Sequence, residues 1–320
     1  MSFLRALTSQ VLLVAVMLCA VPVVGFWARD VHWFADFASH FLLPSVLAAC
    51  VVSILAGLLQ RGLTGAAALG VAIAASLGPG TWTSQPNPVP ENLARFKVLQ
   101  FNVWYRNGEP ARMVEAIRSS GADLVVLLEA TPRLRAALDG LADVYPSRLA
   151  CPDGDPCDIV VLARGPLAFE RLSRTSDRNR SPVLSFRTTL ADCPLTVHAV
   201  HLARPFPFSA HDMQPGQARD VASAIARTVG PRIVVGDFNA APWGQVMQTI
   251  TTRAGVSLLG GPGGTWPVRL PQQMRIPIDH VAAGQGLAPV RRQVLAPAGS
   301  DHAPVLATIA VTDPSSCGKQ

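Results

Sequence analysis

The chain has 320 residues, of which 49% are hydrophobic and 15% are charged, and its formal net charge is +6 at neutral pH. It can therefore bury a full core and has apolar sequence left over, which excludes an unfolded, wholly polar chain. The modest positive charge favours anionic partners such as phosphates and anionic lipid surfaces, but it is too diffuse to require nucleic acid.

The surplus apolar sequence lies in three runs at the N-terminal end. Residues 7–27 and 37–59 are almost free of charge, and each can supply the roughly 20 apolar residues that a helix needs to cross a bilayer. Residues 63–82 form a third run, which is rich in Ala and Gly and of marginal length. We therefore predict that residues 1–82 are a membrane anchor of about three transmembrane helices.

Two arginines indicate how this anchor is oriented. Arg5 precedes the first run, and Arg61 lies in the tight turn between the second and third runs. Because positively charged residues favour the cytoplasmic side, three crossings that begin inside leave the rest of the chain outside. The predicted location is the cytoplasmic membrane, with several crossings and an extracytoplasmic domain. The lipid bilayer is the expected partner, and no protein partner can be predicted.

Residues 83–93 are predicted to be a stiff linker, because Pro86, Pro88 and Pro90 cannot continue a helix. After it, short apolar runs separated by turns predict strands and helices in turn. Strands are expected at 96–103, 124–128, 159–162, 183–188, 195–202, 233–235 and 305–309, and helices at 109–119 and 217–228. This succession indicates an α/β layered domain over residues 94–313, followed by a C-terminal tail over residues 314–320.

Four cysteines belong to the part of the chain after the linker, and two of them are close in sequence. Cys151 and Cys157 flank a short loop of Pro, Asp and Gly. In an oxidising compartment they can close a local disulfide, and two unpaired thiols are the alternative.

Polar residues lie at or just after the ends of the apolar stretches. They include the motifs Gly236-Asp237-Phe238-Asn239, Ile278-Asp279-His280 and Ser300-Asp301-His302. The full series is Asn102, Glu129, His201, Asp237, Asn239, Asp279, Asp301 and His302. Carboxylates, histidines and amides delivered together in this way are typical of a metal-plus-histidine site that hydrolyses a phosphoester.

This ordered series, with Thr265-Trp266-Pro267, resembles the endonuclease/exonuclease/phosphatase superfamily, the DNase I-like metal-dependent phosphoesterases, over residues 94–312. The resemblance implies an α/β fold, a four-layer sandwich of two β-sheets flanked by helices, with the site at one rim. Leu128 stands where many relatives have Gln before the metal-binding Glu. That difference alters the surroundings of the metal and leaves the ligand itself intact.

The resemblance also assigns a metal site. It implies that Glu129, assisted by Asn102, holds Mg²⁺ or Mn²⁺, and that Asp301 adds negative charge beside the metal. Both cations are hard and prefer carboxylate and amide oxygens.

The remaining residues are assigned to catalysis by the same resemblance. Asp237 orients or deprotonates the attacking water, and Asn239 fixes water and phosphate. Asp279 holds His302 in one tautomer, so that the other imidazole nitrogen stabilises the phosphoryl oxygens. His201 donates to a phosphate oxygen. Together these groups neutralise charge in an in-line displacement.

Two further segments have less specific patterns. Arg180 ends an arginine-rich stretch between two predicted strands and is a candidate substrate-phosphate clamp, with a solvated loop as the alternative. Pro205-Phe206-Pro207-Phe208 follows His201 and reads either as an apolar lip that touches membrane or lipid substrate, or as a buried loop anchor. His198 and His280 are predicted to be structural.

The leading hypothesis is a membrane-anchored, metal-dependent phosphoesterase that hydrolyses a lipid or other envelope phosphoester. The chain is similar to bacterial membrane members associated with glycopeptide-antibiotic resistance, which suggests lipid-linked phosphates such as polyprenyl carriers. The alternative is a tethered extracytoplasmic nuclease that binds nucleic acid through a basic, aromatic groove. A non-catalytic binding protein is a third hypothesis, which the intact residue set disfavours.

Overall fold

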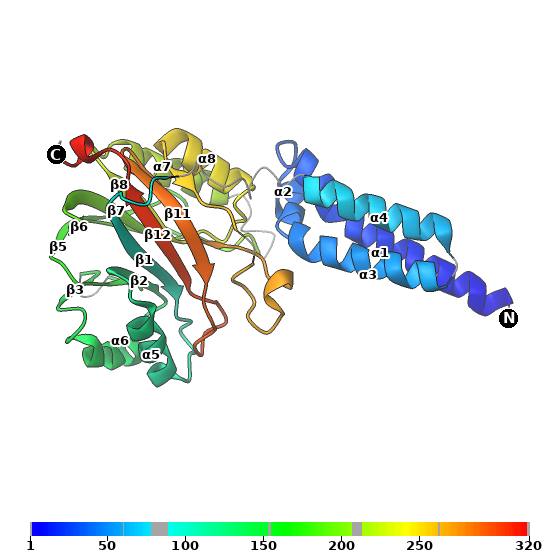
Figure 1. Ribbon diagram of the computed structural model, residues 1–320, viewed down its shortest axis with the longest axis horizontal. Coiled ribbons are helices and arrows are strands. Elements are labelled where there is room, and N and C mark those ends of the chain that lie inside the picture. Colours follow the sequence, from blue (N-terminus) through cyan, green and yellow to red (C-terminus); the bar gives the residue numbers. More distant parts are fainter. Residues whose placement is uncertain are drawn as a thin grey trace.

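The computed structural model describes residues 2–59, 61–77, 89–152, 155–206, 213–261 and 263–318. An N-terminal group of helices projects from one end of a β-sandwich (Figure 1). The helices of this group are α1 (Ser2–Ala28), α2 (Trp33–Ser39), α3 (Leu42–Leu58) and α4 (Gly62–Leu77).

The sandwich contains two six-stranded sheets, ordered β11-β12-β1-β2-β4-β3 and β5-β6-β7-β8-β10-β9. The first sheet consists of β1 (Arg95–Asn102), β2 (Leu124–Leu128), β3 (Ser147–Ala150), β4 (Val160–Ala163), β11 (Leu287–Val294) and β12 (Val305–Val311). The second consists of β5 (Leu167–Arg174), β6 (Pro182–Leu190), β7 (Cys193–His201), β8 (Arg232–Asp237), β9 (Ser257–Leu258) and β10 (Asp279–Gly284).

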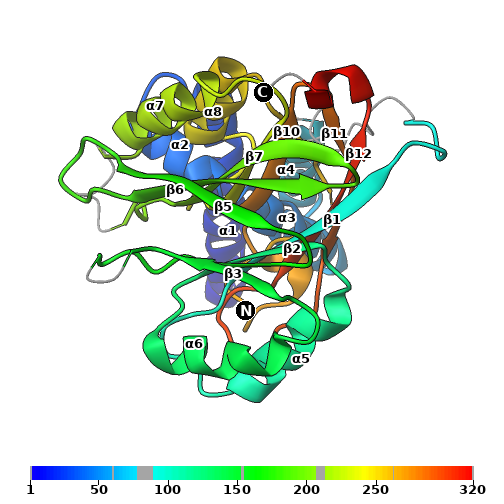
Figure 2. The same ribbon diagram turned by 90° about the vertical axis from the view of Figure 1, so that its left-hand side faces the viewer.

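Helices cover the outer face of each sheet, and this arrangement gives four layers (Figure 2). The first sheet is covered by α5 (Pro110–Ser120), α6 (Pro132–Ala137) and the 3-10 turn η2 (Leu138–Leu141), and the second by α7 (Met213–Ala226) and α8 (Gln245–Ala254). Two further 3-10 turns are η4 (Gln272–Met274) and η5 (Pro314–Gly318). The predicted four-layer α/β sandwich is confirmed.

Strand β1 shows why the sandwich has three apolar layers. Its side chains alternate, so that Phe96 and Val98 enter the core between the sheets while Leu99 and Phe101 pack under α5. A strand that is buried on both faces reads as a nearly continuous apolar run. That is how the short runs of the sequence become central strands.

Strand register brings the ends of four strands to one rim. In the first sheet β1 and β2 are parallel and pair Asn102 with Leu128, so that Glu129 follows directly beside Asn102. In the second sheet β7 and β8 are also parallel and pair His201 with Asp237. Strand β10 begins at the same rim, since Asp279 pairs with Asp237.

The N-terminal helices pack as a bundle whose two ends differ. At the end far from the sandwich, the guanidinium of Arg61 donates to the carbonyl of Arg5 at 3.0 Å. The other end is formed by residues 33–41, which comprise α2, His40 and Phe41; we call this segment the elbow. The two arginines that define the predicted orientation therefore lie at the same end of the bundle.

Among the described residues, Phe3–Ala28 is the one helix that is long and apolar enough to cross a membrane by itself. Helices α2 and α3 pass the same test only as a pair, which is bent by 64°, and α4 is shorter. The number of crossings therefore stays a prediction. Residues 78–82 of the third predicted helix and residues 83–88 of the predicted linker lie outside the described residues.

The second predicted helix, residues 37–59, differs from the structure, because it is divided between α2 and α3. Two observations explain the break. Pro44 has no backbone N–H to donate to the carbonyl of His40, and the carbonyl of Ser39 accepts a hydrogen bond from the indole of Trp243 at 2.8 Å instead of one from its own helix.

The elbow is fixed to the sandwich by the segment that follows β8. The carboxylate of Asp36 accepts from the backbone N–H of Gln245 at 2.9 Å, and the Gln245 side chain donates to the carbonyl of Arg29 at 2.6 Å. The buried Trp243 packs in one apolar cluster with residues of the bundle, including Phe26 and Leu42. The bundle and the sandwich therefore share a packed interface.

Two disulfides are present in the described part of the chain. Cys151 pairs with Cys157, as the sequence allowed, and Cys193 pairs with Cys317 across a sequence separation of 124 residues. The second disulfide joins the start of β7 to η5. The C-terminal segment from residue 314 is therefore attached to the sandwich rather than being a free tail, while residues 319–320 lie outside the described residues.

Candidate active site

The predicted polar series converges at the rim, around a cavity of about 470 Å³. Six of its members line this cavity: Glu129, His201, Asp237, Asn239, Asp301 and His302. The other two, Asn102 and Asp279, are almost completely buried and contact the lining residues from behind. The structure therefore brings together all eight residues of the series.

Asn102 connects the two sheets at the base of the site. Its amide nitrogen donates to the carboxylates of Glu129, at 3.0 Å, and of Asp237, at 3.1 Å. Its amide oxygen accepts from the backbone N–H of Trp104 at 3.0 Å. One side chain at the end of β1 thus fixes the predicted metal ligand and the predicted base relative to each other.

Asp279 and His302 form a buried pair. The Nδ1 of His302 lies 2.9 Å from one oxygen of Asp279, and the other oxygen accepts from Gln100 at 2.8 Å. Burial lowers the pKa of His302, but the carboxylates of Asp279 and Asp237 outweigh it and raise that pKa to about 10. Burial raises the pKa of Asp279, but the charge and hydrogen bond of His302 outweigh this effect, so that the pKa is lowered overall. The pair is therefore ionic at neutral pH.

Asp237, at the end of β8, lies beside the Asp279–His302 pair. Its carboxylate accepts from the backbone N–H of Asn239 at 2.8 Å and is 3.8 Å from the Nε2 of His302. Burial and the charge of Asp279 raise its pKa to about 6, although His302 and His201 oppose the shift. A carboxylate with this pKa is ionised at pH 7 and basic enough to take a proton.

The backbone around Asp237 leaves no room for a side chain at the preceding position. A Cβ on Gly236 would lie 1.8 Å from the carbonyl oxygen of Val200 on β7. Glycine there allows β7 and β8 to approach closely enough to place His201 beside Asp237. Glu129 and Asn239 have positive φ angles of 57° and 48°, and non-glycine residues in this strained region cluster at functional sites.

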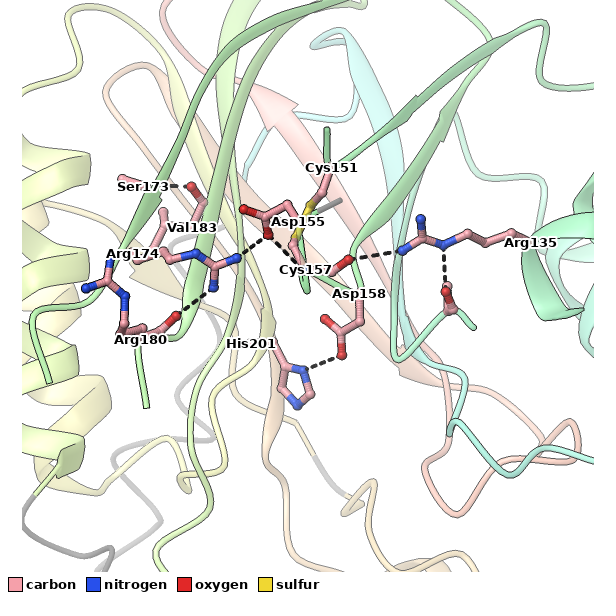
Figure 3. The surroundings of a disulfide bond; sticks show 11 residues. Arg135, Cys151, Asp155, Cys157, Asp158, Ser173, Arg174, Arg180, Val183 and His201 are labelled. Carbon is pink, nitrogen blue, oxygen red and sulfur yellow. Dashed lines mark hydrogen bonds and ion pairs between the residues drawn. A yellow bond between two sulfur atoms is a disulfide. The ribbon is translucent and has the colours of Figure 1, made fainter. Parts of the chain in front are cut away.

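His201 is held by a carboxylate that the sequence analysis missed. Its Nδ1 lies 3.1 Å from Asp158, a residue of the first sheet's side of the sandwich, just before β4 (Figure 3). Burial lowers the pKa of His201, but the hydrogen bond and charge of Asp158, with the charges of Asp237 and Glu129, raise it to about 9. Asp158 lies outside the motifs on which the site was predicted, and it directly follows Cys157 of the disulfide loop.

The loop closed by the first disulfide directly precedes Asp158. Cys157 immediately precedes Asp158, and its backbone N–H donates to the carboxylate of Asp155. That carboxylate also pairs with Arg174 of β5, so the loop is fixed to the second sheet (Figure 3). The disulfide and the ion pair together position Asp158 against His201.

The donors present fit a hard divalent cation. Glu129 and Asp301 offer carboxylates, and Oδ1 of Asp301 is buried without a hydrogen-bond partner while its other oxygen accepts from Trp266 at 3.2 Å. An unpaired buried carboxylate oxygen is costly unless a cation or donor satisfies it. Asp237, Asp279 and His302 also lie within metal-binding distance of one another, but the Asp279–His302 pair already uses those atoms.

Arg180 is not brought to this cavity. It lies exposed in the turn between β5 and β6, where its carbonyl accepts from Arg174 at 2.8 Å. Among the described lining residues, the arginines are Arg106 and Arg204. The role of Arg180 as a phosphate clamp stays a prediction that the geometry does not support.

The other segments singled out in the sequence are placed as follows. Phe206 lines the cavity, whereas Pro207 and Phe208 lie outside the described residues. His280 is buried and its Nε2 lies 2.9 Å from the carbonyl of Ala240; burial lowers its pKa to about 4. His198 is buried between Ser185 and Thr228. Neither histidine lines the cavity at the rim, and the structural role of both stays a prediction.

Part of the wall of the cavity comes from the elbow. Phe37, His40 and Phe41 line the same cavity as Asp237 and His302. The sequence analysis did not anticipate this contact, because residues 33–41 read as the boundary of an apolar run.

This arrangement can carry out hydrolysis at phosphorus. Two protonated histidines face the cavity and can neutralise phosphoryl oxygens, a basic carboxylate lies between them, and further carboxylates can hold a cation. These are the groups that an in-line displacement by water requires.

Solved structures with the same fold support this interpretation of the architecture. An endonuclease/exonuclease/phosphatase from Beutenbergia cavernae matches with a TM-score of 0.56 and 20% identity, covering 68% of this chain and 72% of that one. The human Nocturnin catalytic domain with bound sulfate matches with a TM-score of 0.54 and 16% identity, covering 69% of this chain and 96% of that one. Danio rerio TDP2 complexed with single-strand DNA product matches with a TM-score of 0.55 and 17% identity, covering 68% of this chain and 99% of that one.

A search of curated proteins found no match. The family comparison is decisive, because residues 99–302 match the Endonuclease/Exonuclease/phosphatase family over more than half of the chain. The chain is a member of that family of phosphoester hydrolases.

Proposed function

We propose that the chain is a membrane-anchored, divalent-metal-dependent phosphoesterase that hydrolyses a lipid or other envelope phosphoester. The observation that carries the substrate class is that two parts of the chain line one cavity. Site residues of the sandwich line it together with Phe37, His40 and Phe41 of the apolar N-terminal part. A substrate in the site therefore contacts the end of the helical bundle.

The metal requirement rests on family membership and on the donor set. Members of this family are generally dependent on a divalent metal, and Glu129, Asn102 and Asp301 would hold Mg²⁺ or Mn²⁺ here. When bound, the cation polarises a phosphoryl oxygen and neutralises developing charge.

The chain's own residues then carry the proton and orient the water. Asp237 takes a proton from the attacking water as the oxygen bonds to phosphorus, and Asn239 holds that water in line. The ester P–O bond breaks, and the proton passes to the departing oxygen. His302 and His201, both protonated at neutral pH, stabilise the negative charge on the phosphoryl oxygens.

The membrane anchor is supported by the surface of the helical bundle. Large exposed apolar side chains are concentrated before residue 74, and in the described part of the chain beyond residue 89 they are Tyr105, Phe169, Phe206 and Val229. A water-exposed apolar surface of that extent is unfavourable, whereas hydrocarbon covers it without cost.

The extracytoplasmic orientation is supported by the disulfides. Disulfides such as Cys151–Cys157 and Cys193–Cys317 persist in oxidising compartments and are rare in the cytosol. Arg5 and Arg61 at the opposite end of the bundle favour the cytoplasmic side.

A tethered nuclease is the second candidate. It is favoured by the fold's similarity to a TDP2 solved with a single-strand DNA product, and by Arg106, Arg204 and Tyr105 at the cavity. A nuclease of this kind binds DNA with a steep salt dependence through phosphate contacts and base stacking.

Turnover by the full-length protein in detergent tests the proposal. The substrates are farnesyl diphosphate, a phospholipid, and single- and double-stranded DNA, each with Mg²⁺ or Mn²⁺ and with EDTA. We expect metal-dependent release from a lipid substrate, and a loss of about 10²–10⁴-fold in Asp237→Ala. Asp139→Ala removes an exposed carboxylate outside the cavity and is the matched control.

The outcomes separate the candidates. Turnover of DNA alone makes the protein a nuclease. A folded protein without metal-dependent turnover of any substrate contradicts the enzymatic assignment to these substrate classes and revives a binding role.

A further inference from the structure

The lining of the cavity combines polar and apolar groups. Asp237, Asp301 and His302 supply charge and hydrogen-bonding groups that a phosphate needs. The apolar groups are of distant origin: Phe37 and Phe41 from the elbow, Phe206 after β7, and Ile276 and Ile278 before β10.

We propose that the elbow is the chain-binding wall of the active site, and that Phe37 and Phe41 hold the first part of a single apolar chain that is esterified to the reacting phosphate. The inference rests on the proposed phosphoesterase function and specifies its substrate class. Phe37 and Phe41 are specificity-determining residues, because they contact the chain and not the reacting atoms.

The elbow is built into the site rather than resting against it. Its Asp36 and Ser39 accept hydrogen bonds from the two residues, Gln245 and Trp243, that follow the Asp237 motif by only a few positions. At Gly244, an added Cβ would lie 3.1 Å from the imidazole of His40. The close packing of the elbow against this segment sets the distance between the aromatic wall and the catalytic carboxylate.

Close packing also fixes the elbow against the bundle. An added Cβ on Gly25 of α1 would lie 2.6 Å from the carbonyl oxygen of Ala35. The side chain of Ser39 donates to the carbonyl of Asp36 at 2.6 Å. The aromatic wall is therefore held from two sides.

The size of the cavity favours one chain. A volume of about 470 Å³ accommodates roughly 15 groups of the size of a water molecule. That is enough for a phosphate and the first carbons of a single chain, and too little for a headgroup with two chains. The remainder of the chain has to leave through the opening.

Exposed apolar surface adjoins the elbow. Phe41 is 39% exposed and Phe206 is 61% exposed, while α1 and α3, next to the elbow, present further apolar side chains on their outer faces. A chain that leaves the cavity past Phe41 therefore continues along apolar surface. Because the burial of each further methylene on such a surface is favourable, specificity for long chains is expected.

Isoprenyl monophosphates of different lengths test this inference with the reacting phosphoester held constant. The full-length protein in detergent is assayed for phosphate release from dimethylallyl, geranyl and farnesyl monophosphate, and from dioleoyl phosphatidic acid as the two-chain alternative. We expect kcat/KM to rise at least tenfold from dimethylallyl to farnesyl monophosphate, and to be lower for phosphatidic acid.

Substitutions in the elbow then test the residues. Phe37→Ala and, independently, Phe41→Ala are each expected to lower the farnesyl-to-dimethylallyl ratio of kcat/KM at least fivefold. Phe34→Ala is the matched control, because Phe34 lies on the same helix, is exposed and does not line the cavity. Thermal unfolding of each variant shows that the ratio was measured on folded protein.

Each outcome decides something different. No turnover of any phosphoester by the wild type refutes the proposed function itself. Turnover that does not depend on chain length, or a proportional loss for all lengths in both variants, overturns the chain-binding wall and leaves the phosphoesterase standing. Faster turnover of phosphatidic acid than of farnesyl monophosphate overturns the assignment to a single chain.

Discussion

At the scale of single residues, the two histidines of the site are held by carboxylates from different parts of the fold. His302, in the loop before β12 of the first sheet, pairs with Asp279 of β10 in the second sheet, and His201 of β7 in the second sheet pairs with Asp158, just before β4 of the first. In both cases the hydrogen bond at Nδ1 leaves Nε2 directed toward the site. The two pairs give the cavity two cations in the same protonation state.

Replacing Asp158 by Asn should change how stability depends on pH. The pKa of His201 in the folded protein, about 9, lies above its ordinary value of 6.5, so this group stabilises the fold below pH 6.5 and the contribution is lost as pH rises through 9. The pKa of Asp158 is lowered, so its contribution is present above its ordinary value and lost as the pH falls below it. Asp158→Asn should lower the free energy of unfolding by about 2 kcal/mol near pH 6, a figure reduced to allow for the partial exposure of the two side chains.

The measurement is thermal unfolding of wild type and variant in EDTA from pH 5 to 10. The difference between the two proteins should shrink as the pH approaches 10. Asp155→Asn, which removes a nearby carboxylate that does not contact His201, should show no such convergence. A pH-independent difference for Asp158→Asn contradicts the assigned pair.

At the scale of elements, the elbow interface depends on one indole. Trp243 is 3% exposed, packs with residues of α1 and α3, and donates to Ser39. Trp243→Ala should destabilise the protein by about 3–5 kcal/mol through the cavity that it leaves, and Trp243→Phe by about 1 kcal/mol through the lost hydrogen bond. Melting temperatures in detergent rank the variants, and equal values for wild type and Trp243→Ala contradict the packed interface.

The two disulfides should differ in what they stabilise. Cys193–Cys317 closes a loop with a sequence separation of 124, whereas Cys151–Cys157 closes one of 6. Loop-closure entropy predicts that Cys193→Ser with Cys317→Ser lowers the free energy of unfolding by about 5 kcal/mol, and that Cys151→Ser with Cys157→Ser lowers it by about half as much. Removal of Cys151–Cys157 should lower kcat more than removal of Cys193–Cys317, because the short loop positions Asp158.

Denaturant unfolding and turnover of the two double variants measure both effects. A larger loss of stability from the short loop would show that native contacts, and not chain entropy, set the order. Equal effects of the two double variants on kcat would show that the Cys151–Cys157 loop does not position Asp158 and His201 for catalysis.

The elements and residues that could be predicted share one property, which is that their signal is local. Apolar runs predicted the central strands, and Glu129 and Asp237 were found because each directly follows such a run. Asp158 was missed because it belongs to none of the motifs that predicted the site, and the Cys193–Cys317 pair has no local signal. The elbow was missed for a physical reason: its contacts are with Trp243 and Gln245, some 200 residues away.

At the scale of the whole molecule, the proposed membrane anchor would set which face of the sandwich lies next to the bilayer. The cavity lies where the bundle joins the sandwich, and the N-terminus and the α3–α4 turn lie at the far end (Figure 1). If the bundle spans the bilayer, the site opens at the membrane surface. Hydrolysis of a membrane-bound substrate then requires no extraction of its chain into water.

Single cysteines at the two ends of the molecule test this orientation. In a background with Cys19→Ala and Cys50→Ala, Ser119→Cys places an exposed thiol on α5, and Leu63→Cys places one beside the α3–α4 turn, where Leu63 is 91% exposed. A membrane-impermeant maleimide should label Ser119→Cys in intact cells and Leu63→Cys only after permeabilisation, because the positive-inside tendency puts Arg5 and Arg61 in the cytoplasm. The reverse pattern would place the site inside the cell. Labelling of both thiols in intact cells would show that the α3–α4 turn does not lie on the cytoplasmic side, and the proposed three-crossing anchor would then have to be abandoned.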